Sequence, residues 1–165
     1  EEAITAPFQE EGPRRLPVAR FRELLGGDEV AAARALETGL AHVEGDDVVV
    51  PNPRFFAVGL ELLAEGFPPR AMVEMAAGLA RAMDDVARLC VSFVDEHLWR
   101  SFVDAGMPAD DAERVAGVVQ RMRPRAQAAA DAALAEAMER HVDELFSQTA
   151  ARLATKARRR NKPSA

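Results

Sequence analysis

Three histidines and one cysteine are the residues of this sequence best suited to bind a metal or to transfer protons. His42, His97 and His141 are scattered along 165 residues, and Cys90 is the single cysteine. Metal sites in proteins usually show His and Cys at close spacing, and the sequence contains no such group. The consecutive residues 95–97 (DEH) would point in different directions on a helix. The sequence therefore predicts neither a metal site nor a bound cofactor.

Motifs for nucleophilic catalysis and for phosphate binding are missing as well. The sequence has no catalytic serine or cysteine motif and no glycine-rich phosphate loop, and Gly26 and Gly27 are expected to end a helix. Cys90 falls on an apolar stripe, where a cysteine most simply serves as a small buried hydrophobe. We therefore expect the protein not to be an enzyme.

Aromatic residues and two histidines gather in two segments that could line a pocket for a small apolar or aromatic molecule. Effector sites between helices are mostly apolar and carry a few polar groups. The alternative is that the same residues form ordinary helix core, because aromatic residues at helical spacing usually pack. The predicted pocket residues are Phe93, His97, Trp99 and Phe102 in the first segment, with Met138, His141 and Phe146 in the second.

The elements that must position these residues are expected to be mainly helical. Hydrophobic residues make up 48% of the chain and aromatic residues only 5%, while alanine is abundant, a balance that favours an all-α protein. Pro17 begins a first helix, and Asp28 is a good N-cap for a second helix that ends at Gly39. Two short apolar runs then flank EGDD, the signal of a β-hairpin with Gly45 at its bend. Asn52 and the proline after it restart a helix.

A long helix is predicted over residues 69–105, and it carries an unbroken apolar stripe. The spacing of the stripe alternates four and three residues, which is the heptad pattern of a coiled-coil seam and predicts a homodimer. In the other interpretation the stripe faces the last helix of its own chain. The predicted seam residues are Met72, Ala76, Leu79, Met83, Val86 and Cys90, and the stripe continues through Phe93 and His97.

The remaining elements complete a long-helix bundle. A short helix is predicted over residues 109–122, and Pro124 is expected to start the last helix. The sequence predicts four segments: a linker at 1–15, a degenerate winged helix-turn-helix at 16–68, a helical effector and dimerisation domain at 69–157, and a disordered basic tail at 158–165. Within the linker, Ile4 and Phe8 could dock on the body of the protein.

The charge distribution argues against DNA binding by these residues. The net charge is −6, and residues 151–165 hold six basic residues and no acidic one, so the remainder carries −12. A helix that reads DNA needs cations, yet Arg34 is the only base between residues 28 and 38. The expected wing carries Glu44, Asp46 and Asp47, which would repel phosphates. A small packing subdomain is the simpler interpretation of this unit.

The order of these motifs resembles the MerR family of transcriptional regulators. ETGL at 37–40 and EGF at 65–67 are similar to two turns of that family, although the aromatic and arginine residues of its DNA contacts are missing. Four further segments look like the helical effector region that follows the DNA-binding domain in larger members: ITAPF at 4–8, VPNPRFF at 50–56, EHLWRSFVDAGMP at 96–108 and AALAEAMERHVDELF at 132–146.

The resemblance implies an effector-sensing and dimerisation domain, with promoter DNA bound by an upstream domain. The alternative function is a helical dimer module of a transcription factor that binds no ligand. The basic tail either touches nucleic acid or is a solvated chain end. A single cysteine and the lack of any apolar run long enough to span a membrane suggest a cytoplasmic protein.

Overall fold

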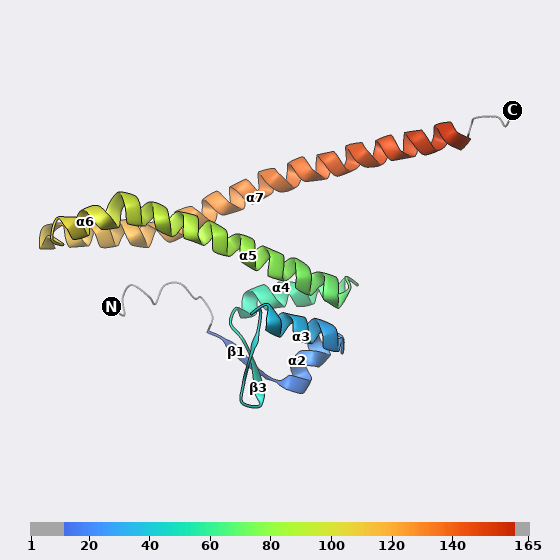
Figure 1. Cartoon of the computed structure of the whole chain (residues 1–165), viewed down its shortest axis with the longest axis horizontal. Helices are drawn as coiled ribbons and strands as arrows, with labels where there is room; N and C mark the ends of the chain where they lie inside the picture. The colour runs from blue at the N-terminus through green and yellow to red at the C-terminus, as the bar shows by residue number, and fades with distance from the viewer. Residues whose placement is uncertain (1–11, 161–165) are drawn as a thin grey trace. The chain divides into compact units, whose positions relative to one another are not determined.

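The computed structural model describes residues 12–160, apart from the side chains of residues 155 and 157–160. As the composition predicts, the chain is mainly helical, and its strands form one small antiparallel sheet (Figure 1). The fold divides into two compact units between Ala87 and Arg88. The predicted docking of Ile4 and Phe8 and the last five residues of the predicted tail lie outside the described residues.

The first unit contains a three-stranded sheet and four helical segments. Its strands are β1 (Arg14–Pro17), β2 (His42–Glu44) and β3 (Asp47–Val50), arranged in the order β1-β3-β2 with antiparallel neighbours. Arg14 lies opposite Val50, and His42 lies opposite Val49. The helices are α2 (Val18–Leu24), α3 (Glu29–Glu37), α4 (Pro53–Ala64) and the first part of α5 (Pro69–Val94).

Local sequence signals explain where α3 and α4 begin and where the turns fall. The Asp28 carboxylate accepts hydrogen bonds from the backbone N–H groups of Val30 and Ala31, and the Asn52 side chain accepts one from Phe55. Each bond satisfies a backbone donor that the first turn of a helix leaves free. Gly39 ends α3 at a φ of 77°, a conformation that side chains with a Cβ rarely adopt. The predicted caps are therefore confirmed.

Strand β1 was not expected from the sequence. The sequence predicts a linker at residues 14–15 and a helix that starts at Pro17, but Arg14–Pro17 pairs along β3 and α2 begins only at Val18. A tertiary contact explains why this segment forms a strand. The edge of β3 that does not pair with β2 has free backbone hydrogen-bonding groups, and residues 14–17 satisfy them. The three valines of β3 are then buried, and Leu16 of β1 is buried beside them.

The core of the first unit includes the beginning of α5. Phe21 of α2 and Leu25, the residue after α2, are each 1% exposed, and Met72 and Val73 of α5 belong to the same buried cluster. The predicted boundary at residue 68 therefore cuts through a packed core. Met72 is also unavailable as part of a dimer seam, since its own chain already covers it. The exposed part of the predicted seam begins further along α5, with Leu79 and Met83.

The second unit is a set of long helical segments. Helix α5 passes into a π-helical turn (Asp95–Trp99) and then α6 (Arg100–Asp104), which together form the predicted long helix. The chain turns at Gly106 and Met107, both with positive φ, and continues as α7 (Ala109–Arg160) (Figure 1). Of the described residues in this unit, only Phe102 and Val115 are buried.

Helix α7 is one continuous helix, so the predicted break before Pro124 is wrong. A proline inside a helix loses one hydrogen bond and crowds the preceding turn, at a cost of about 3 kcal/mol. Here Pro124 lies between good helix formers, with RMR before it and RAQAAA after it. Their helix propensities offset part of that cost.

Candidate functional site

The predicted pocket residues near the π-helical turn form two aromatic pairs. The rings of Phe93 and His97 have centroids 4.8 Å apart and are tilted by 58°, and those of Trp99 and Phe102 lie 5.9 Å apart and are tilted by 49°. Phe102 is buried, whereas Phe93 and Trp99 are exposed. A π-helical turn widens the helix locally and is often found at functional sites. This segment therefore presents aromatic surface to its surroundings.

The other three predicted pocket residues lie far along α7. Met138 and Phe146 are exposed, and the His141 ring places Nδ1 3.1 Å from Glu144 Oε2 on the helix surface. The first group of predicted pocket residues, which begins at Phe93, lies within 12 residues of the turn that precedes α7. This separation is about 18 Å along a helix. Met138 comes 29 residues after the start of α7, about 43 Å. A single chain thus does not bring the two predicted groups together.

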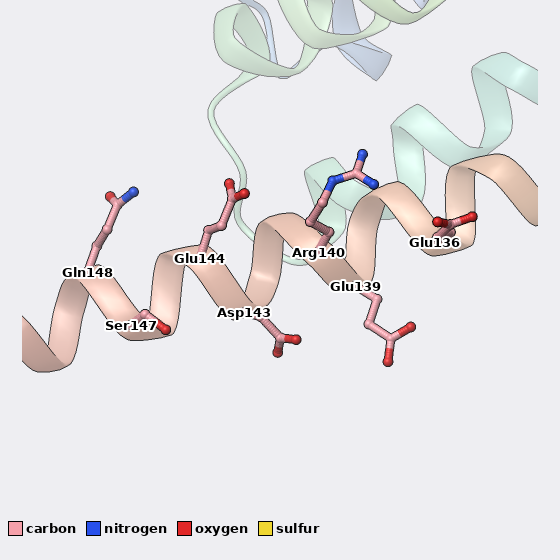
Figure 2. Close-up of a pocket in the computed structure, with 7 residues that line it drawn as sticks. All are labelled: Glu136, Glu139, Arg140, Asp143, Glu144, Ser147 and Gln148. Carbon is pink, nitrogen blue, oxygen red and sulfur yellow. The ribbon is translucent and has the colours of Figure 1, made fainter.

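One side of α7 between residues 136 and 148 is polar, and Figure 2 shows its side chains. They spread outward from a single helix and border an open stretch of its surface, so they cannot enclose a ligand. Among the described residues, no group of His, Cys, Asp and Glu has the geometry to hold a metal ion. The seven residues of this polar face are Glu136, Glu139, Arg140, Asp143, Glu144, Ser147 and Gln148.

A small cavity and an open groove lie among the described residues of the first unit. The cavity measures about 40 Å³ and lies among core residues that include Leu25, Phe56 and Met72, so it is a packing gap too small for an organic ligand. The groove, of about 480 Å³, is lined mainly by apolar residues of α4 and of the turn after it, including Phe67, and by Leu24 of α2. Sequence reasoning missed this groove because its walls come from segments about 40 residues apart.

Carboxylates neutralise the arginines that a DNA-binding unit would need. Arg34, the single base of α3, donates through Nε and Nη2 to both oxygens of Glu74 and also contacts Glu37. These hydrogen bonds raise the pKa of Arg34 and lower the pKa of Glu74. At the β2–β3 hairpin Glu44 pairs with His42 and Arg15, which lower its pKa. The guanidinium of Arg34 is thus held toward α5 by an ion pair.

We expect the chain not to bind duplex DNA at physiological salt. The acidic residues of the β2–β3 hairpin would repel phosphates, and Arg34 is already paired with carboxylates. Even non-specific DNA binders reach dissociation constants of about 10⁻⁴ to 10⁻⁶ M under these conditions. Fluorescence anisotropy with a labelled duplex measures the affinity, and sequence-specific nanomolar binding would contradict the expectation.

Asp28 joins α3 to α5 and should make stability depend on pH. Its Oδ2 accepts a hydrogen bond of 2.8 Å from Arg70 Nε, and this bond, followed by the one from Ala31, holds the pKa of Asp28 below its ordinary value of 3.8. A carboxyl with a lowered pKa stabilises the fold fully above its unfolded pKa, and this contribution is lost as the pH falls through the folded pKa.

The matched variant is Asp28→Asn, which keeps an N-capping side chain but cannot ionise. Its melting temperature should be lower than that of the unchanged protein at pH 7, and the difference should shrink below pH 4. A difference that stays constant from pH 7 to pH 2 would show that the charge of Asp28 contributes nothing.

Comparisons of the chain with protein-family models, with curated proteins and with solved structures find no match. Among the described residues no helix is both long and apolar enough to cross a membrane.

Proposed function

We propose that this chain is a helical dimerisation region of a MerR-like transcriptional regulator. One observation carries the proposal: the described part of the second unit buries only Phe102 and Val115 while it exposes many large apolar side chains. Exposed apolar surface of this extent marks an interaction site. These exposed residues include Leu89, Val91, Phe93 and Trp99 before the turn, and Leu134, Met138, Val142, Leu145, Phe146 and Leu153 on α7.

The architecture of the first unit is compatible with a role in a transcriptional regulator. Its element order, β1-α2-α3-β2-β3 with a three-stranded antiparallel sheet, is compatible with a degenerate winged helix-turn-helix. Arg15, Arg34 and Arg70 of this unit are paired with carboxylates, so the unit would serve as a packing scaffold for the start of α5. Promoter binding would then fall to a separate domain of the regulator.

A second candidate function is the binding of an aromatic effector beside the π-helical turn. The observation in its favour is the pair of exposed rings, Phe93 and Trp99, each in contact with a neighbouring aromatic residue. Trp99 is the only tryptophan, so its emission reports directly on this surface. A screen of aromatic compounds in which none changes Trp99 emission would exclude this function.

Hydrogen exchange tests the dimerisation function. An isolated helix frays, whereas a helix that packs against a second copy is protected. Amides of residues 131–154 should exchange more slowly as the protein concentration rises, because the dimer population rises with it. Amides of the first-unit core, such as those of Val48 and Val50, serve as the internal control and should not respond. Protection of residues 131–154 that is independent of concentration would contradict the proposal.

A further inference from the structure

The second half of α7 has two chemically different sides. Its polar face holds four carboxylates and is drawn in Figure 2. The opposite side carries a line of side chains that we name the α7 stripe, whose five aliphatic members are exposed by 44–63%. The α7 stripe consists of Leu134, Met138, Val142, Leu145, Thr149 and Leu153.

Thr149 fits this apolar line although threonine is polar. Its hydroxyl donates a 2.8 Å hydrogen bond to the backbone carbonyl of Leu145. The hydroxyl is thereby satisfied within the helix, which leaves the methyl group as the part of the side chain free for packing. The α7 stripe is therefore continuous along 19 residue steps of helix, a length of about 28 Å.

The spacing of the α7 stripe reads the same in both directions. Successive members are four, four, three, four and four residues apart, and the midpoint falls between Asp143 and Glu144. The pattern follows an 11-residue repeat, which keeps a stripe on one side of an almost straight helix. A second copy of α7 that runs antiparallel places Leu134 opposite Leu153, Met138 opposite Thr149 and Val142 opposite Leu145.

The charges at the two ends of the α7 stripe are complementary. Asp131 lies three residues before Leu134, and Lys156 lies three residues after Leu153, so both continue the same line. In an antiparallel pair Asp131 of each copy faces Lys156 of the other. A parallel pair would instead place Asp131 beside Asp131 and Lys156 beside Lys156, which repel.

We propose that the α7 stripe is a two-fold symmetric, antiparallel interface with a second copy of this chain. This inference rests on the proposed dimerisation function and names its surface. A two-fold interface must be self-complementary, because the same surface contacts itself. The reversible spacing and the opposite charges at its ends give the α7 stripe that property. The polar face in Figure 2 then stays in contact with solvent.

Charge reversal at the ends tests the pairing. Asp131→Lys and Lys156→Asp should each raise the dissociation constant of the dimer about tenfold, because each turns two attractions per dimer into two repulsions. The two changes together restore opposite charges, and the double variant should associate as the unchanged protein does. All three variants keep the α7 stripe itself. Weakening that the double variant does not restore would overturn the antiparallel pairing.

Disulfide cross-linking tests the direction of the pairing independently. With Cys90→Ser as background, Leu134→Cys combined with Leu153→Cys should give covalent dimers on mild oxidation. Leu134→Cys alone should give none, since the two copies of residue 134 lie at opposite ends of an antiparallel interface. Efficient cross-linking of the single variant would indicate a parallel pair and would contradict the inference.

A substitution in the predicted seam on α5 distinguishes failure of this inference from failure of the proposed dimerisation function. Met83→Asp alters the exposed part of the seam on α5 and leaves α7 unchanged. If the α7 interface is correct, this variant still forms the dimer with the cross-link described above. If Met83→Asp abolishes the dimer and the end-charge variants do not affect it, the chain dimerises through α5 and the α7 stripe is not the interface.

Discussion

Replacement of Phe21 by alanine is expected to lower the free energy of unfolding of the first unit by about 3–5 kcal/mol. Phe21 is 1% exposed, and its ring stacks on Phe56 with centroids 5.9 Å apart. The substitution removes this contact and leaves a cavity next to the gap of about 40 Å³ that Phe21 already lines. Urea denaturation followed by circular dichroism measures the loss.

Phe67→Ala is the matched control for this prediction. Phe67 is 55% exposed in the turn after α4, so its truncation should cost less than about 1 kcal/mol. Equal losses for Phe21→Ala and Phe67→Ala would show that α2 does not pack in the core as described.

Leu145→Asp should weaken self-association at least 100-fold. In the antiparallel interface Leu145 lies near the two-fold axis opposite Val142 of the second copy, so each dimer would bury two unpaired carboxylates. Burial of an unpaired charge costs several kcal/mol, and about 1.4 kcal/mol corresponds to a tenfold change in affinity. Sedimentation velocity over a concentration series measures the dissociation constant.

Gln148→Asp adds the same charge to the same helix, but on the polar face. It should leave the dissociation constant within a factor of two or three, because the new carboxylate remains in water. If Leu145→Asp and Gln148→Asp weaken the dimer equally, then the added negative charge on α7 causes the weakening. The location of Leu145 on the α7 stripe would not be its cause.

Signals that act over a few residues could be predicted from the sequence. Asp28 and Asn52 cap α3 and α4 as predicted, because a capping side chain and the amides it binds lie within three residues. Gly39 and Gly45 take the positive φ values that their turns require. The mainly helical fold also follows from composition.

Features that depend on distant partners could not be predicted. Strand β1 forms only because β3, more than 30 residues later, offers an edge. The apolar period of α5 shows which side of the helix is buried but not by what, and Met72 turns out to be covered by its own unit. The two groups of predicted pocket residues have suitable side chains, but the second group lies too far along α7 to reach the first.

The α7 stripe could not be predicted from the sequence for a different reason. Its 11-residue repeat departs from the heptad pattern, and Thr149 looks like an interruption until its hydroxyl is seen to bond to the helix backbone. The reversible spacing is present in the sequence. It indicates a two-fold interface only if residues 131–156 lie on one continuous helix, as they do in α7.

Sedimentation equilibrium at tens of micromolar is the most direct test of the claim that a second copy completes the second unit. The chain has a mass of 17.9 kDa, and the account predicts a particle of twice that mass that dissociates on dilution. A mass of 17.9 kDa that persists up to hundreds of micromolar would contradict it, and the exposed apolar residues of α7 would then have to be covered by another part of the same chain or by a different protein.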